Sequence, residues 1–195
     1  MFKSKEPTQV IWTKFSDYYK VCDNSAMRGG TYAFVFNETK PNPWEMPCEF
    51  ERCVYIGESA GNYVDRQAPG KNKDRSHMHK RMTRHHKPLT TGESGETSHQ
   101  KIIKEYGYGD AVINGTLTGA PLWLCLLIPR PDVDDYAVKA WAQYQERLQI
   151  YEYICTFGRS PLGNMDCDTS KNPNSHSSKT LATRGSLVEF MVEEI

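Results

Sequence analysis

The stretch that decides the fold is "CVYIGESAGNYVDR", residues 53–66. A short apolar run ends in Tyr55-Ile56-Gly57 and then breaks into small and polar residues. We predict a strand over 51–57, because β-branched and aromatic residues favour strands and small polar residues end them. A tyrosine at the end of such a strand belongs either to the aromatic core or to a functional site, and the rest of the chain must decide between the two.

Around this strand the chain contains few other regular elements. "TYAFVF" (31–36) predicts a strand that follows two glycines, and the three prolines of 38–47 predict a long loop that joins it to the next strand in an antiparallel pair. "PLWLCLLI" (121–128) is apolar on both faces and predicts a buried central strand. We expect helices over 76–86, ending before Pro88, and over 136–157. The prediction is a small α/β or α+β domain: a three-stranded mixed sheet flanked by helices.

Length and composition favour a single soluble domain. The chain has 195 residues, of which 38% are hydrophobic and 25% are charged, with a formal net charge of zero. We expect one domain over 1–165 with its core at about 30–165, a polar linker at 90–98, and a polar loop and C-terminal segment over 166–195 packed on the same domain. The start carries no apolar signal core, and no run is long enough for a bilayer, so we expect a cytoplasmic protein with no membrane partner.

The six cysteines contain no CxxC pair, and we interpret them as free thiols. Cys48 and Cys53 make only a weak zinc half-site, because zinc needs clustered ligands.

The long helix over 136–157 carries a carboxylate that we expect to face the core. At 100° per residue, Glu152 shares a stripe with apolar neighbours, whereas Glu146 points well away from it. An ionised carboxylate in that position needs a partner such as Arg, Lys or a metal ion. The other interpretations are a structural salt bridge and a helix end that opens to solvent near Gly158. The predicted stripe consists of Trp141, Gln145, Leu148, Glu152 and Cys155.

A basic, histidine-rich segment follows the opening stretch. Between residues 71 and 87 there are seven Lys or Arg and four His against one Asp. So many positive side chains in one segment repel one another unless a polyanion neutralises them. Nucleic-acid phosphate is the commonest such partner. A solvated helix face is the alternative, and a zinc site is weaker because no Cys or carboxylate completes a set of ligands. The candidate nucleic-acid-binding residues are Lys71, Lys73, Arg75, His79, Lys80, Arg84 and Lys87.

Taken together, three motifs resemble the GIY-YIG endonuclease family. "GTYAF" (30–34) looks like a divergent first motif with its tyrosine at Tyr32, and "VYIGES" (54–59) matches the second motif. "EYICTFGRSPLGN" (152–164) matches the family's ending, a glutamate followed by proline and asparagine nine and twelve residues later. The resemblance covers roughly 30–165. Within this range, the connection from Tyr32 to Tyr55 is longer than in compact members of the family.

The family also has a helix that bears a catalytic arginine, with His or Tyr four residues later. Arg81 with His85 fits this pattern best and implies an insertion after the second motif. Arg75 with His79 and Arg66 remain the alternative arginines.

The resemblance implies hydrolysis of DNA phosphodiester bonds with one Mg²⁺ or Mn²⁺ ion. The metal would be held by Glu152, and Arg81 would bind the phosphate oxygens. Tyr32, our first choice, or Tyr55 would orient or deprotonate the attacking water, while His85 would hydrogen-bond that tyrosine or act as a base itself. The implied site consists of Tyr32, Tyr55, Arg81, His85, Glu152 and Asn164, the last of these orienting the others.

The biological role stays open at this point. A restriction-like enzyme and a free-standing phage-type nuclease fit a chain with no obvious appended DNA-binding array, and a homodimer would allow both strands to be cut. A repair or recombination nuclease and a catalytically inactive nucleic-acid-binding module with the same fold are the alternatives.

Overall fold

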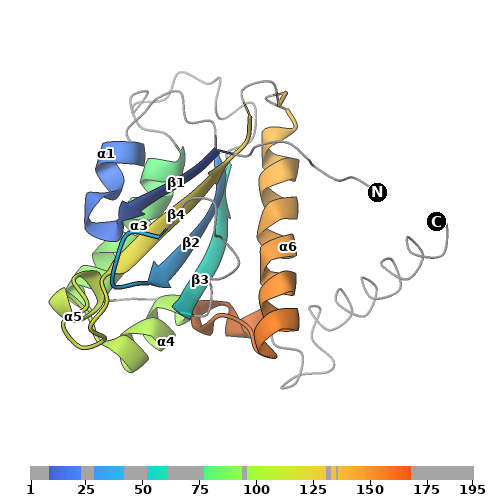
Figure 1. The fold of residues 1–195 in the computed structure, drawn as a ribbon. Coiled ribbons are helices and arrows are strands. Elements are labelled where there is room, and N and C mark those ends of the chain that lie inside the picture. Colours follow the sequence, from blue (N-terminus) through green and yellow to red (C-terminus); the bar gives the residue numbers. More distant parts are fainter. Residues whose placement is uncertain are drawn as a thin grey trace.

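The computed structural model describes residues 9–22, 29–41, 52–60, 77–93, 96–130, 133–134 and 136–167. This part of the chain has an α+β fold, in which one antiparallel sheet lies between helices on its two faces (Figure 1). The predicted α/β or α+β class is therefore confirmed. The expected strand number and the expected mixed pairing are not.

The sheet has four strands in the order β1-β4-β2-β3, and each neighbouring pair is antiparallel. The strands are β1 (Gln9–Lys14), β2 (Gly30–Phe36), β3 (Cys53–Ser59) and β4 (Leu122–Ile128). Three of them were predicted within about two residues. The fourth, β1, pairs with β4 and was not predicted, although the Val, Ile, Trp and Thr of its "QVIWTK" sequence favour a strand. The apolar stretch of β4 fits its central position, where both faces are covered.

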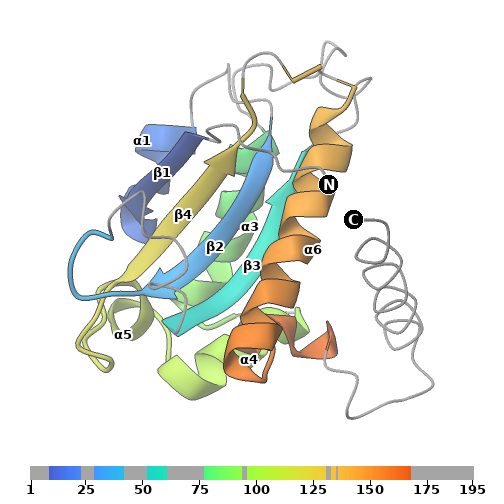
Figure 2. The ribbon, with the colours of Figure 1, turned by 45° about the vertical axis from the view of Figure 1, so that its right-hand side comes forward.

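Helices cover both faces of this sheet. Figures 1 and 2 show α6 on one face, with α1 and α3 on the opposite face. The helices and short 3₁₀ turns of the described residues are η1 (Phe15–Asp17), α1 (Tyr18–Cys22), α3 (His77–Thr91), α4 (Thr97–Tyr106), α5 (Asp110–Ile113), α6 (Val138–Phe157) and η3 (Leu162–Cys167).

The helix α3 continues through Pro88 to Thr91, so the expected end before the proline is wrong. Pro88 lacks the N–H that would bond to the Arg84 carbonyl, and its ring crowds that turn, so packing must offset this cost. Leu89 is fully buried beyond it, and this packing holds the final turn in place. The expected linker over 90–98 is correspondingly shorter, because α4 already begins at Thr97.

The side chains of β2 alternate between two hydrophobic cores. Tyr32, Phe34 and Phe36 pack into the core on the α3 side, whereas Ala33 and Val35 pack into the core on the α6 side. A buried hydrogen bond of 3.0 Å from the Thr31 hydroxyl to a carbonyl of α6 ties this helix to the strand. The alternation therefore directs Tyr32 toward α3, where the basic segment lies.

Two further expectations bear on the chain's chemistry. Cys22, Cys53, Cys125 and Cys155 form no disulfide with one another, which agrees with the expectation, while Cys48 lies outside the described residues. Within the described ranges, none of the helices combines the length and the apolar character that crossing a bilayer requires.

Candidate active site

A close contact between Tyr32 and Gly57 explains the glycine of the opening motif. The two residues lie opposite each other in the β2–β3 pair. A Cβ atom at Gly57 would lie 2.6 Å from the Tyr32 Oη atom and 2.8 Å from a ring carbon of Tyr55. Real Cβ atoms do not approach other atoms so closely, so only glycine leaves room for the Tyr32 hydroxyl here.

Arg81 and His85 reach the same hydroxyl from α3. Their spacing of four residues places them on one face of that helix. The Arg81 Nε group donates a hydrogen bond of 3.0 Å to Tyr32 Oη, and Tyr32 Oη lies 2.7 Å from His85 Nε2. The structure thus brings together three of the predicted residues, and the rings of Tyr55 and His85 pack with centroids 5.1 Å apart. The alternative arginines Arg66 and Arg75 lie outside the described residues.

A second buried histidine continues this network. His99, in α4, has its Nε2 atom 2.7 Å from His85 Nδ1. Its own Nδ1 atom lies 3.6 Å from the carboxylate of Glu96, which precedes α4. Sequence reasoning missed His99, because the linker was expected to end at residue 98 and no helix was predicted immediately after it.

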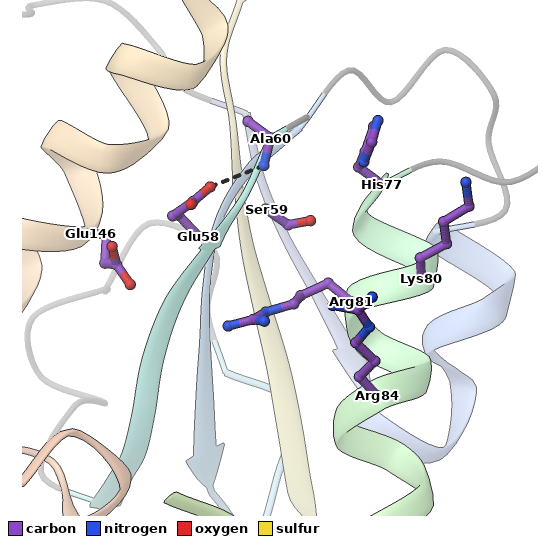
Figure 3. A pocket seen from close by; sticks show the side chains of 8 residues that line it. All are labelled: Glu58, Ser59, Ala60, His77, Lys80, Arg81, Arg84 and Glu146. Atoms are coloured by element: carbon purple, nitrogen blue, oxygen red, sulfur yellow. Dashed lines mark hydrogen bonds between the residues drawn. The ribbon is translucent and has the colours of Figure 1, made fainter. Parts of the chain in front are cut away.

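A pocket of about 430 Å³ opens beside Arg81 between the edge strand β3, α3 and α6. Figure 3 shows Arg81 extending from α3 toward β3, with Glu58 and Glu146 on the opposite side. Glu58 accepts a hydrogen bond of 3.0 Å from the backbone N–H of Ala60. The lining therefore has an acidic side and a basic side; its residues are Glu58, Ser59, Ala60, His77, Lys80, Arg81, Arg84 and Glu146.

The inward carboxylate of α6 is Glu146. The expectation that Glu152 faces the core is wrong, and so is the expectation that Glu146 points away from it. Glu152 is exposed and is not part of the pocket lining, whereas Glu146 is. The buried residues of α6 are Val138, Ala142 and Tyr153, and Glu146 follows Ala142 by one turn on the same stripe. Apolar residues are spread around the circumference of α6, so the sequence pattern did not fix which face turns inward.

The environment of the pocket changes the acidity of its groups. Burial, together with the nearby Glu58 carboxylate, raises the pKa of Glu146 to about 7, although Arg81 partly counteracts this. Burial holds the pKa of His85 well below its ordinary value, with His99 and Arg81 contributing, so this imidazole is neutral at neutral pH. Burial also raises the pKa of the Tyr32 hydroxyl, an effect that Arg81 opposes.

Asn164 supports the edge strand and does not line the pocket. Its Oδ1 atom accepts a hydrogen bond of 2.8 Å from the Ile56 N–H, and its Nδ2 group donates one of 2.7 Å to the Ile56 carbonyl. The neighbouring Gly163 packs so closely on Tyr55 that a Cβ would lie 2.6 Å from the tyrosine ring. The asparagine thus fixes the β3 backbone between Tyr55 and Gly57.

The predicted nucleic-acid-binding residues divide into three groups. Lys80 and Arg84 are exposed and line the pocket, and Lys87 is exposed one turn further along α3. His79 is buried, with 5% of its surface exposed, so its expected place on a binding surface is wrong. The three remaining residues, Lys71, Lys73 and Arg75, lie outside the described residues.

A scan against protein-family models and searches of curated proteins and of solved structures returned no match for this chain. The candidate site therefore has to be interpreted from its own geometry and from the sequence motifs.

Proposed function

We propose that this protein is a divalent-metal-dependent DNA endonuclease that hydrolyses phosphodiester bonds. The observation that carries the proposal is the Tyr32 hydroxyl, which Arg81 and His85 bind at 3.0 and 2.7 Å beside a pocket lined by both carboxylates and basic groups. A cation and a neutral imidazole around one phenol are suited to moving its proton. The resemblance to the GIY-YIG endonucleases supports the same reaction.

The acidic side of the pocket fits a single Mg²⁺ or Mn²⁺ ion. No cluster of three or more His, Cys, Asp or Glu side chains occurs in the described part of the chain. Mg²⁺ nevertheless commonly takes only one or two carboxylates and completes its shell with water and phosphate oxygens. We assign Glu146, assisted by Glu58, as the ligand in place of Glu152, because a cation relieves the repulsion between these two carboxylates. When bound, the ion would stabilise negative charge on the leaving oxygen.

The remaining side chains have separate roles. Arg81 uses Nε to hold Tyr32, and the rest of its guanidinium group faces the pocket, where it would bind a non-bridging phosphate oxygen (Figure 3). Tyr32 is fully buried and does not line the pocket, so the attacking water would have to reach its hydroxyl past Arg81. There Tyr32 would take a proton from that water and pass its own proton to His85. Lys80 and Arg84 would bind the DNA backbone beside the cleaved bond.

A binding module without catalysis is the less favoured function. A module that only binds has no use for a metal ion at this site. Without a metal ion, the negative charges of Glu58 and Glu146 would repel the DNA phosphates. A biological role in restriction, phage growth or repair, and pairing of two copies to cut both strands, stay predictions from the sequence.

The test compares two carboxylates of the same helix. We expect Glu146→Gln to lower Mg²⁺-dependent cleavage of supercoiled plasmid at least about 100-fold, since it removes the charge that holds the metal. Glu152→Gln is the matched control and should remain within about twofold of the wild type, because Glu152 is exposed away from the pocket.

The opposite ranking of these two variants would show that the metal assignment is wrong. Gel-shift binding of the plasmid by a wild-type protein that cuts with neither Mg²⁺ nor Mn²⁺ would favour the binding module instead. Circular dichroism and thermal unfolding of each variant show whether a loss of cleavage reflects a loss of fold.

A further inference from the structure

A chain of close polar contacts leads from Tyr32 away from the pocket to the protein surface. Tyr32 Oη lies 2.7 Å from His85 Nε2, and His85 Nδ1 lies 2.7 Å from His99 Nε2. His99 Nδ1 then lies 3.6 Å from the carboxylate of Glu96, whose side chain is 53% exposed. Glu96 is not among the residues that line the pocket. The chain therefore connects the hydroxyl to solvent at a second place.

The contacts along this chain favour one direction of donation. If Tyr32 donates to His85 Nε2, then the His85 Nδ1–H donates to His99 Nε2. The proton of His99 is then on Nδ1, which makes no hydrogen bond to the described residues in this conformation and lies 3.6 Å from the Glu96 carboxylate. The reverse direction would place an unprotonated His99 Nδ1 atom beside that carboxylate, where two acceptors face each other. The resting state should therefore have both imidazoles protonated at Nδ1.

Burial makes such a chain necessary if Tyr32 is to lose its proton. Tyr32 is fully buried, and His85 and His99 are each about 1% exposed, so bulk water does not reach these groups in this conformation. The groups that face the two imidazoles are Tyr32 from β2, Tyr55 from β3, Arg81 from α3 and Glu96 before α4. Burial lowers the pKa of both histidines, which keeps each imidazole neutral with a single proton to pass on.

We propose that His99 and Glu96 form the outlet of a proton relay that serves Tyr32. The Tyr32 O–H bond breaks as an N–H bond forms at His85 Nε2, while the His85 Nδ1 proton moves to His99 Nε2. The His99 Nδ1 proton passes to Glu96 or to water beside it. A phenolate then remains next to the Arg81 cation, both imidazoles are neutral in the other tautomer, and one proton has reached the surface. As long as Tyr32 is still a phenolate, a proton that enters at His99 and moves in the opposite direction returns to the Tyr32 oxygen and restores the resting tautomers.

The relay rests on the proposed nuclease function for its use, but its resting tautomers can be tested without any cleavage. We expect ¹⁵N NMR of the histidine-labelled full chain at pH 7.5 to show His85 and His99 both protonated at Nδ1, the less common tautomer of free histidine. Spectra of His99→Gln and His85→Gln assign the signals. Finding both histidines protonated at Nε2 would overturn the proposal, whether or not the protein cuts DNA.

Two substitutions at His99 separate proton transfer from simple support. A glutamine can accept the hydrogen bond from His85 but cannot pass a proton on, whereas a phenylalanine only fills the space. We expect His99→Gln and His99→Phe to lower the cleavage rate at saturating DNA by a similar factor, about 10- to 100-fold, with DNA affinity unchanged. His86→Gln is the control, because His86 neighbours His85 on α3 and packs on Tyr18, outside the chain of contacts.

The relay would be wrong if His99→Gln kept the wild-type rate while His99→Phe lost it, because that result indicates support alone. Partial recovery of the rate of His99→Ala by added imidazole would favour proton transfer, and no recovery at any imidazole concentration would count against it. If the wild-type protein cleaves no DNA but the NMR spectra show both histidines protonated at Nδ1, the nuclease proposal is wrong and the proposed proton path still holds.

Discussion

The glycine of Tyr55-Ile56-Gly57 is the residue on which the site's geometry depends most directly. It leaves the space that the Tyr32 hydroxyl fills, and the hydroxyl then lies within reach of both Arg81 and His85. In the sequence this glycine is only the end of an apolar run. Because Gly57 has no side chain, the Tyr32 hydroxyl can lie over it in the core on the α3 side of the sheet.

We therefore expect Gly57→Ala to disturb the site more than the fold. The new methyl group would lie 2.6 Å from Tyr32 Oη, and relief of that contact must shift the hydroxyl away from its partners. Overpacking of this kind costs about 1 to 3 kcal/mol of stability, and a displaced catalytic group costs about 100-fold in rate. Plasmid cleavage and urea denaturation measure the two effects.

Gly158→Ala separates these effects from the general cost of replacing a glycine. Gly158 ends α6 with a positive φ of 66°, and a Cβ there would meet nothing within 4 Å. This control should lose about 1 kcal/mol of stability and keep its cleavage rate. An alanine at 57 that leaves the rate unchanged would show that the Tyr32 hydroxyl is not needed where it lies.

At the scale of elements, the sequence predicts those features that depend only on the order of residues within one helix or strand. The strands β2, β3 and β4 and the span of α6 follow from β-branched runs and helical periodicity, and the Arg81–His85 spacing placed both groups on one helix face. The inward face of α6 and the contact between His85 and His99 depend on how separate elements pack. No spacing within one element contains that information, so Glu146 and His99 could not be identified.

The turn η3 holds the edge strand β3 through one side chain, and this makes a prediction about Asn164. Asn164→Asp would replace the donor to the Ile56 carbonyl with a second acceptor, leaving that carbonyl facing a carboxylate. We expect a loss of about 1 to 3 kcal/mol in the free energy of unfolding at pH 7, measured by urea denaturation.

Asn114→Asp is the matched control for this change. Asn114 also donates through Nδ2, at 2.8 Å to Asp110, but on the exposed surface, so its loss should cost less than about 1 kcal/mol. Equal stability losses in the two variants would contradict the idea that Asn164 holds β3 in place.

At the scale of the whole molecule, the pocket lies where acidic side chains from β3 and α6 face basic side chains from α3. The layer made by β3 and α6 supplies Glu58 and Glu146, and the layer made by α3 supplies Lys80, Arg81 and Arg84. The formal net charge of zero conceals this division. Glu146 pays the electrostatic cost of it, because its charge is buried beside a second carboxylate.

The stability of the protein should record that cost as pH changes. The pKa of Glu146 is raised from 4.5 to about 7 in the folded state, so folding holds a proton that the unfolded chain releases. The resulting stabilisation is fully present below pH 4.5, is lost as pH rises toward 7, and changes little above that. Glu146→Gln lacks this titration and should gain roughly 1 to 3 kcal/mol relative to the wild type between pH 4.5 and 8.

Urea denaturation at a series of pH values, without metal, measures this difference, and the titration of His85 and other groups cancels between the two proteins. Adding Mg²⁺ at pH 8 should then stabilise the wild type and leave Glu146→Gln unchanged, because the ion replaces the lost proton at the carboxylate pair. Parallel stability curves for the two proteins would mean that Glu146 ionises as an ordinary surface carboxylate. In that case the acidic side of the pocket would have no stored repulsion for a metal ion to relieve.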